Sequence, residues 1–235
     1  MGQKKLVRFE AIKSFSNVLQ YPEGMSGKWN DFFNNSSQLT LELACGKGEY
    51  AVQLATMYPR RNFIGVDLKG NRLYVGAKKC LEHNIMNAAF LRTQIVKIND
   101  YFTAGEVAEI WITFPDPQLR KSKANKRLTH PRFLRLYQQF LYPGGNIHLK
   151  TDSPDLYNFT KTVISMYGLL LHEDRENLYA DNNINPELRI KTHYESLDIA
   201  QSNRIHYLRF SLPPSALPDL DDQLRDRINE HEKTN

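Results

Sequence analysis

The pattern of apolar and polar positions changes character along the chain. From residue 39 onward, short apolar runs alternate with stretches in which apolar residues recur every three or four positions. The runs predict buried strands, and the stretches predict amphipathic helices. The expected strands are 39–44, 62–68, 88–93, 106–114 and 144–151, and the expected helices are 49–58, 70–84, 131–141 and 153–168. Strands that alternate with helices of this length favour βαβ units, and so an α/β fold with a doubly wound, mostly parallel sheet.

The two ends of the chain do not follow this alternation. Residues 1–38 are polar and aromatic by turns and are punctuated by proline and glycine, so we expect an arm or cap rather than a core element. Near the other end, 167–174 and 205–213 read as strands on either side of a polar loop, which suggests an antiparallel pair at a sheet edge. The expected organisation is an N-terminal arm (1–38), one α/β domain (39–212) and a frayed or weakly helical polar tail (213–235).

Composition narrows the class of protein. The 235 residues suffice for one sizeable domain, and a net charge of +5 is compatible with an anionic partner without requiring one. Cys45 and Cys80 lie far apart and form no CxxC pair, which excludes a disulfide framework and a cysteine zinc site. The N-terminal segment lacks the apolar core of a secretory signal, and no apolar run approaches the roughly 18 residues of a membrane span. We therefore expect a cytoplasmic protein, without a membrane segment or a bound metal, whose state as monomer or homodimer stays open.

A glycine turn follows the first expected strand. In "LELACGKGEY", Gly46 and Gly48 separate that strand from the first helix, where glycine lets a ligand approach the backbone amides that open a helix. About twenty residues later Asp67 ends the next strand, where an acid can accept hydrogen bonds from a ribose diol. A lone GxG is most simply a tight turn, but the glycines and the acid together favour a nucleoside site.

Glu42, inside the strand before the turn, bears on which nucleoside binds. A carboxylate there would repel a pyrophosphate but suits a cationic ligand such as a sulfonium or an amino group. This position favours S-adenosylmethionine over a nicotinamide dinucleotide. The alternative is that Glu42 simply faces solvent.

The segment "FPDPQLRKSKANKRL", Phe114 to Leu128, places an acid beside a run of cations. Two prolines restrict the backbone around Asp116 at the carboxyl end of an expected strand, where ligands of open α/β sheets bind. The cations that follow can hold phosphates, or they can form a solvated charged loop. They are Arg120, Lys121, Lys123, Lys126 and Arg127.

Several motifs in order resemble the tRNA (guanine-N7-)-methyltransferase family, which are Rossmann-type enzymes that use S-adenosylmethionine. From about residue 5 to residue 212, these motifs are "RFEAIKSFSNVLQYP", "LELACGKG", "GVDLK", "FPDP…KRL", "HLKTD" and "THYE". The resemblance implies methyl transfer from S-adenosylmethionine to N7 of a guanosine in tRNA, in the variable loop.

The resemblance also implies roles for individual residues. It implies cofactor contacts by Glu42, Gly46, Gly48, Asp67, Gln94 and Asp116. It implies substrate contacts by Arg120, Asp152, Thr192, Tyr194 and Glu195, and RNA phosphate contacts by Lys121, Lys123, Lys126 and Arg127. Gln94 stands where the family usually has Asp or Asn, and Gln118, Leu119 and Ser122 also depart from its pattern. Asp116 is the expected catalytic residue.

Chemistry supports this role for Asp116. Guanine N7 carries a lone pair and no proton, so attack on a sulfonium methyl needs alignment rather than a strong base. A carboxylate can accept from the guanine N1–H and amino group, and it can favour the cationic product. "THYE" also fits a helix capping box, because Thr192 precedes Glu195 by three residues.

Three other classes remain as alternatives. A non-catalytic RNA-binding protein would not need the acids at positions 42, 67 and 116, and a small-molecule methyltransferase would not need the cationic run. A nicotinamide dehydrogenase is disfavoured by Glu42. Cys45 has no histidine partner in the sequence pattern and is expected to be a packing residue rather than a nucleophile.

Overall fold

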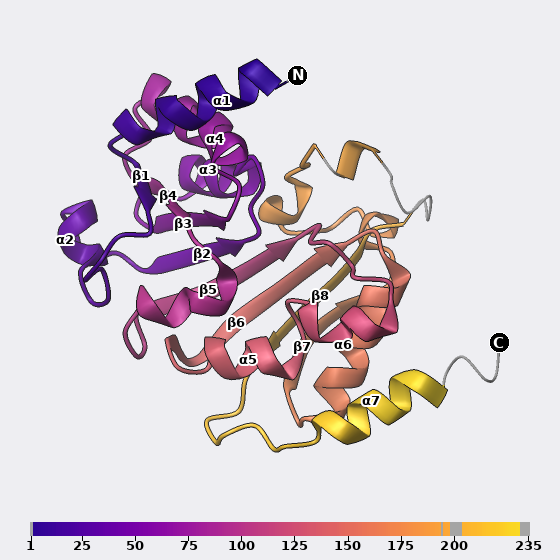
Figure 1. Cartoon of the computed structure of the whole chain (residues 1–235). Helices are drawn as coiled ribbons and strands as arrows, with labels where there is room; N and C mark the ends of the chain where they lie inside the picture. Colours follow the sequence, from indigo (N-terminus) through magenta and orange to yellow (C-terminus); the bar gives the residue numbers. More distant parts are fainter. Residues whose placement is uncertain (1, 194, 198–203, 231–235) are drawn as a thin grey trace.

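The computed structural model describes residues 2–193, 195–197 and 204–230, in which eight strands form one twisted sheet (Figure 1). The strand order is β1-β4-β3-β2-β5-β6-β8-β7. The strands are β1 (Val18–Gln20), β2 (Leu39–Leu43), β3 (Asn62–Asp67), β4 (Ala88–Arg92), β5 (Val107–Thr113), β6 (Leu141–Thr151), β7 (Leu170–Arg175) and β8 (His206–Ser211). The pairs from β1 to β6 are parallel, whereas β8 runs antiparallel to both β6 and β7. The expected parallel sheet with an antiparallel edge pair is confirmed.

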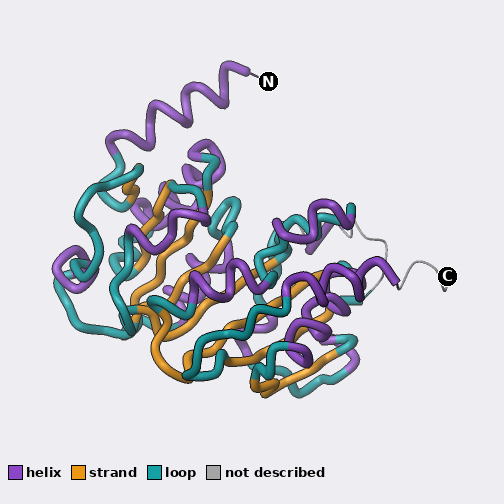
Figure 2. Tube along the Cα trace, turned by 60° about the horizontal axis from the view of Figure 1, so that its bottom comes forward, coloured by secondary structure: helices purple, strands orange, loops and turns teal. Residues whose placement is uncertain are grey.

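Helices lie on both sides of this sheet (Figure 2). The α-helices are α1 (Gly2–Ala11), α2 (Trp29–Phe33), α3 (Glu49–Met57), α4 (Gly70–Glu82), α5 (Pro131–Tyr137), α6 (Pro154–Met166) and α7 (Asp221–Glu230). Short 3-10 turns are η1 (Ile12–Ser14), η2 (Ile95–Asp100), η3 (Lys121–Lys126), η4 (Leu178–Ala180), η5 (Pro186–Arg189) and η6 (Glu195–Leu197).

Successive strand residues feed two separate cores. In β3, Phe63 belongs to the core under α3 and α4, whereas Ile64 belongs to the core under α5, α6 and α7. In β5, Trp111 and Ile112 divide between the two cores in the same way. Neighbouring side chains of a strand point to opposite faces, so a strand covered on both faces is apolar at most positions, with Thr40 and Glu42 of β2 as buried exceptions. This explains why the strands read as continuous apolar runs.

The N-terminal arm contributes directly to the fold. β1 pairs in parallel with β4 and extends the sheet by one edge strand. Ile12 and Trp29 are buried, and the Trp29 indole N–H donates to the Tyr101 carbonyl oxygen at 2.8 Å. Residues 1–38 were expected to be a cap rather than a core element. Their irregular pattern hides this contribution because the burial of each aromatic side chain depends on distant residues.

The C-terminal segment is more ordered than its composition suggests. Residues 221–230 form α7, whose Leu224 is fully buried against the sheet domain. Arg135 of α5 donates to both carboxylate oxygens of Asp221 at 2.9 and 2.8 Å, and the Tyr167 hydroxyl donates to the same carboxylate at 2.7 Å. These tertiary contacts hold a helix that its polar sequence alone would not sustain.

One buried acid joins three elements at the centre of the sheet. Glu42 of β2 is 2% exposed, and its Oε2 accepts the backbone N–H of Ala51 in α3 at 2.8 Å. Its Oε1 accepts the Thr113 hydroxyl, at the end of β5, at 2.8 Å. Burial raises the pKa of Glu42 to about 8, although both hydrogen bonds favour the charged form. Glu42 therefore faces the protein interior and not solvent.

This pKa makes stability depend on pH. Because the pKa of Glu42 is about 8 in the folded protein and near its ordinary value of 4.5 in the unfolded chain, the folded state holds an extra proton between these values. The free energy of unfolding is therefore largest at low pH within this window, and it falls as pH rises through 8. From pH 6 to pH 8 we expect wild type to lose roughly 2 kcal/mol more than Glu42→Gln. Urea unfolding at both pH values measures this, with the exposed Asp100→Asn as the control. Parallel losses in wild type and Glu42→Gln would contradict it.

Candidate active site

A cleft of about 320 Å³ opens where β2, β3 and β4 end at the carboxyl edge of the sheet. Its lining combines one acid, small polar groups and apolar side chains, as nucleoside sites commonly do. The lining residues are Ala44, Asp67, Leu68, Thr93, Gln94, Ile95, Val96 and Phe133. Asp67, which the sequence pattern singled out, and Gln94, which the family resemblance implied, are thus brought together in one cleft.

Asp67 fixes the glycine turn beside this cleft. Its Oδ2 accepts the backbone N–H of Gly46 at 3.0 Å, and its Oδ1 accepts that of Lys69 at 2.7 Å. Gly48 has φ +68°, and a Cβ at this residue would lie 2.3 Å from the Phe90 ring. Glycine is therefore required at position 48 by both its conformation and the space around it. A carboxylate has about four acceptor positions, so Asp67 keeps capacity for two further donors.

The turn that carries Asp116 is strained at both ends. Phe114 has φ +47° and Gln118 has φ +49°, values that non-glycine residues adopt rarely and at a cost. Asp116 is exposed, and its Oδ1 accepts the backbone N–H of Gln118 at 3.0 Å. Thr113, three residues earlier, is tied to Glu42, so this turn and the glycine turn share one buried anchor.

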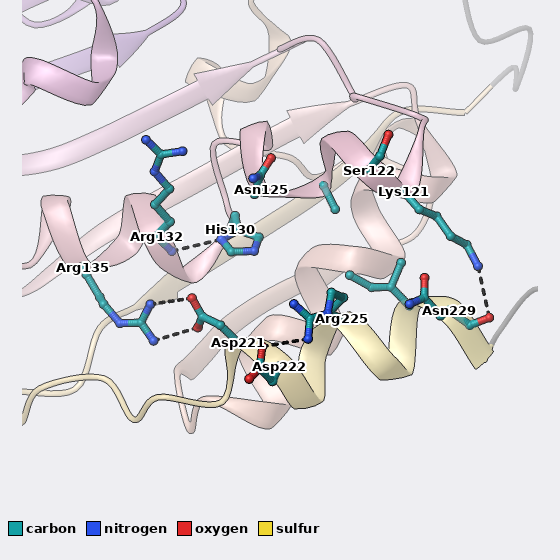
Figure 3. Close-up of a pocket in the computed structure, with 12 residues that line it drawn as sticks. Lys121, Ser122, Asn125, His130, Arg132, Arg135, Asp221, Asp222, Arg225 and Asn229 are labelled. Carbon is teal, nitrogen blue, oxygen red and sulfur yellow. Dashed lines mark hydrogen bonds and ion pairs between the residues drawn. The ribbon is translucent and has the colours of Figure 1, made fainter.

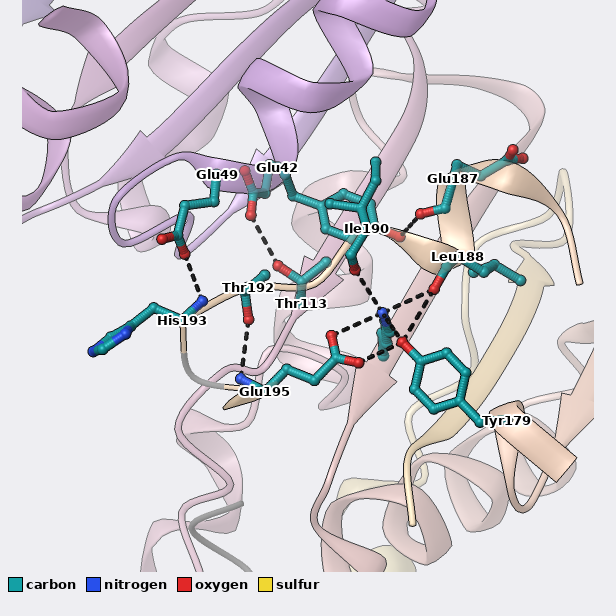
Figure 4. A network of polar contacts seen from close by, with 12 residues as sticks. Glu42, Glu49, Thr113, Tyr179, Glu187, Leu188, Ile190, Thr192, His193 and Glu195 are labelled. Atoms are coloured by element: carbon teal, nitrogen blue, oxygen red, sulfur yellow. Dashed lines mark hydrogen bonds and ion pairs between the residues drawn. The ribbon is translucent and has the colours of Figure 1, made fainter. Parts of the chain in front are cut away.

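Lys150 of β6 holds the polar loop that follows β7. Figure 4 shows Leu188, Ile190 and Glu195 of this loop close to Tyr179. The Lys150 side chain is fully buried, and its ammonium donates to the carbonyl oxygens of Leu188 and Ile190 at 3.0 and 2.8 Å. It also donates to Glu195 Oε2 at 3.0 Å and to the Tyr179 hydroxyl at 3.2 Å. Burial lowers the pKa of Lys150, while the Glu195 carboxylate opposes that shift. A single lysine thus holds several points of the loop.

The "THYE" residues lie in this loop. Thr192 is buried and accepts the backbone N–H of Glu195 at 3.2 Å, which is the hydrogen bond of a cap. The Glu195 carboxylate pairs with Lys150 and also accepts the Tyr179 hydroxyl. The His193 backbone N–H donates to Glu49 Oε2 of α3 at 2.7 Å, so the loop reaches the glycine turn. Tyr194 lies outside the described residues.

The cations after Asp116 fall into different environments. Arg120, Lys123 and Lys126 are exposed, whereas Lys121 is partly covered and donates to the Asn229 carbonyl oxygen of α7 at 3.3 Å. Arg127 is 5% exposed and donates to backbone carbonyls of the Asp116 turn. Asp152, after β6, is partly buried. The run is therefore not a uniform solvated loop.

Two grooves flank α7 beside this segment. One, of about 490 Å³, lies between η3, α5 and α7 and is lined by both signs of charge (Figure 3). Within it, Arg135 pairs with Asp221, and Arg225 pairs with Asp222 at 3.0 Å. The other, of about 620 Å³, includes Lys121 and Lys161.

Sequence reasoning did not assign Thr113 or Lys150. A polar residue ending a buried strand is a weak signal for Thr113, and a single cation inside "GGNIHLKT" is the signal for Lys150.

Burial raises the pKa of the Cys45 thiol, which is typical of a packing residue. No helix among the described residues is long and apolar enough to cross a membrane.

Sequence comparisons relate the chain to known methyltransferases. A family model described as "Putative methyltransferase" matches residues 36–208. The chain is 46% identical over 213 residues to the tRNA (guanine-N(7)-)-methyltransferase of Porphyromonas gingivalis, covering 86% of each protein. It is 42% identical over 236 residues to the enzyme of the same name from Bacteroides thetaiotaomicron, covering 95% of this chain and 93% of that one.

Solved structures share the fold at low sequence identity. The crystal structure of the 16S rRNA methyltransferase KamB superposes with a TM-score of 0.62 at 15% identity, covering 84% of this chain and 99% of that one. A SAM-dependent methyltransferase from Aquifex aeolicus has a TM-score of 0.53 at 12% identity, covering 79% and 88%. These confirm the Rossmann-like methyltransferase fold, and the sequence relatives decide the family. The chain belongs to the tRNA (guanine-N(7)-)-methyltransferase family.

Proposed function

We propose that this protein transfers a methyl group from S-adenosylmethionine to N7 of a guanosine in the variable loop of tRNA. Family membership supports the reaction. The main observation behind this proposal is the position of Asp116. It lies on a strained turn after β5, and β5 pairs with β2, the strand that leads into the glycine turn. The exposed cations follow Asp116 directly in the sequence. The residues that bind the cofactor, the guanine base and the RNA phosphates would then lie at one edge of the sheet.

The cleft beside the glycine turn fits the cofactor. Asp67 has acceptor capacity left for ribose hydroxyls, and the exposed Gln94 at the rim can hydrogen-bond an adenine edge. When bound, S-adenosylmethionine supplies an electrophilic methyl carbon on a sulfonium sulfur. Glu42, beneath the turn, would act on it through the position of α3, whose Ala51 amide it accepts.

Asp116 is proposed to hold the guanine. Its exposed carboxylate can accept from N1–H and the amino group, which leaves the N7 lone pair directed at the methyl carbon. Methyl transfer would form the N7–C bond as the C–S bond breaks, so the base would gain the positive charge that the sulfur loses. A fixed carboxylate beside that base favours the charge where it develops. No proton leaves N7, so a general base is not required.

The polar loop and the cations are proposed to present the RNA. Arg120, Lys123 and Lys126 are exposed and can contact phosphates, with Lys121 at the edge of the same surface. Thr192 and Glu195, held by Lys150, and Asp152 after β6 are proposed to contact the target nucleoside, together with Tyr194. We place this reaction in the cytoplasm.

One assay tests the function. The protein is incubated with labelled S-adenosylmethionine and bulk tRNA, and the digested nucleosides are examined for 7-methylguanosine. A tRNA with 7-deazaguanosine at the variable-loop target lacks the accepting nitrogen and serves as the matched control. Label in another nucleoside, or equal label in the deaza tRNA, would refute the assignment.

Asp67 should serve the cofactor and not the RNA. Asp67→Ala removes the acceptor for the ribose and for the Gly46 and Lys69 amides, so cofactor affinity should fall about tenfold or more. Affinity for tRNA should stay within about twofold, since phosphate contacts carry most of it. Calorimetry with S-adenosylmethionine and filter binding with tRNA measure the two affinities, with the exposed Asp100→Ala as control. A loss confined to tRNA binding would reverse the assignment.

Asp116→Asn should separate charge from shape. The amide oxygen can still accept from the Gln118 N–H, so the turn persists, but the charge is lost and a donor faces the guanine donors. Turnover should fall on the order of 10²-fold, and cofactor affinity should fall less than turnover does. Because Asp116 is not a base, activity should not return at higher pH. Single-turnover methylation from pH 6 to pH 9 measures this, and near-wild-type rates would leave Asp116 as a turn residue.

A further inference from the structure

Arg127 ends the cationic run but points into the protein. Its guanidinium Nε donates to the Pro117 carbonyl oxygen at 3.1 Å, and Nη2 donates to the Gln118 carbonyl oxygen at 3.2 Å. The guanidinium carbon lies 4.5 Å from the centre of the Phe159 ring of α6. The planar group is therefore held on its edge by two carbonyls and on its face by an aromatic ring.

The two carbonyls belong to the turn that carries Asp116. That turn has left-handed, non-glycine backbone at Phe114 and Gln118, a strained conformation that persists only where surrounding contacts enforce it. Pro115 and Pro117 fix φ at their own positions but supply no N–H, so the turn has few internal hydrogen bonds. The contacts from Arg127 come from outside the turn and act at its second strained end.

Burial and charge set Arg127 apart from its neighbours. Its side chain is 5% exposed, whereas Lys123 and Lys126 are exposed. Burial lowers the pKa of Arg127, and the Asp155 carboxylate partly offsets this by favouring the cation. A guanidinium that is buried, hydrogen-bonded and near a carboxylate has little left to offer an RNA phosphate.

We infer that Arg127 is a positioning residue that holds the Asp116 turn against the guanine site, and not a phosphate contact. This inference rests on the proposed function, because its effect is exerted through Asp116. Arginine suits this role because its planar guanidinium donates from two nitrogens while its face stacks on the Phe159 ring, whereas a lysine ammonium has no such face.

Separate binding and rate measurements test this role. For Arg127→Lys, single-turnover methylation at saturating tRNA should slow about tenfold or more, as loss of a preorganised contact does. The salt dependence of tRNA affinity should keep its wild-type slope. The exposed Lys126→Ala is the matched comparison and should lower affinity and reduce the slope by about one counterion.

A double-mutant cycle with Asp116→Asn then tests whether Arg127 acts on the reaction through Asp116. If Arg127 acts through Asp116, adding Arg127→Lys to Asp116→Asn should slow methylation no further than about twofold. The inference would be overturned if the rate losses of the two single variants multiplied in the double variant. It would also be overturned if Arg127→Lys reduced the salt dependence of tRNA affinity but left the methylation rate at saturating tRNA unchanged. Should Arg127→Lys fail to fold, Phe159→Leu removes the ring beneath the guanidinium, leaves both hydrogen bonds possible, and should show the same coupling. Wild type inactive on every tRNA would refute the proposed function instead.

Discussion

The Glu42 carboxylate holds together the parts on which the rest of the site depends. It lies in the strand before the glycine turn, accepts a backbone amide of the following helix and accepts the hydroxyl that ends the neighbouring strand. The glycine turn and the Asp116 turn are therefore fixed relative to each other through one buried side chain. Burying a carboxylate is costly unless its oxygens are hydrogen-bonded, so loosening either turn would leave an unsatisfied buried acid.

Positive charge has two uses in this protein. Exposed cations after Asp116 form a surface suited to phosphates, whereas Arg127 and Lys150 are buried and donate to loop carbonyls. Arg127 holds the Asp116 turn, and Lys150 holds the loop that carries Thr192 and Glu195. A buried cation surrounded by acceptors enforces one loop conformation, because any other would leave the charge unpaired.

The fold by itself does not explain the reaction. Structures that superpose on this chain at 12–15% identity include a 16S rRNA methyltransferase, so the same sheet serves different RNAs. In this chain the candidate site is built by the Asp116 turn, the cationic segment after it and the loop held by Lys150. These are segments at strand ends, where the sheet provides rigidity and the loops provide specificity.

Much of the architecture was determined by local sequence pattern. Continuous apolar runs and helical spacing were enough to predict the parallel sheet and its antiparallel edge, because strand burial depends on the pattern of neighbouring residues. The glycine turn and its spacing pointed to Asp67, whereas Gln94 was expected only from the family resemblance. The contribution of residues 1–38 to the core and the helix α7 could not be predicted from local pattern, since Trp29 and Leu224 are buried by residues far along the chain.

Only the tertiary structure decided how the charged residues are used. Lys126 and Arg127 are adjacent and chemically alike, yet one is exposed and the other is enclosed by Phe159 and the carbonyls of 117 and 118. Glu195 and Lys150 are 45 residues apart and form a buried pair. Whether a charge meets solvent or a partner depends on which distant segments pack over it, and a linear pattern does not contain that information.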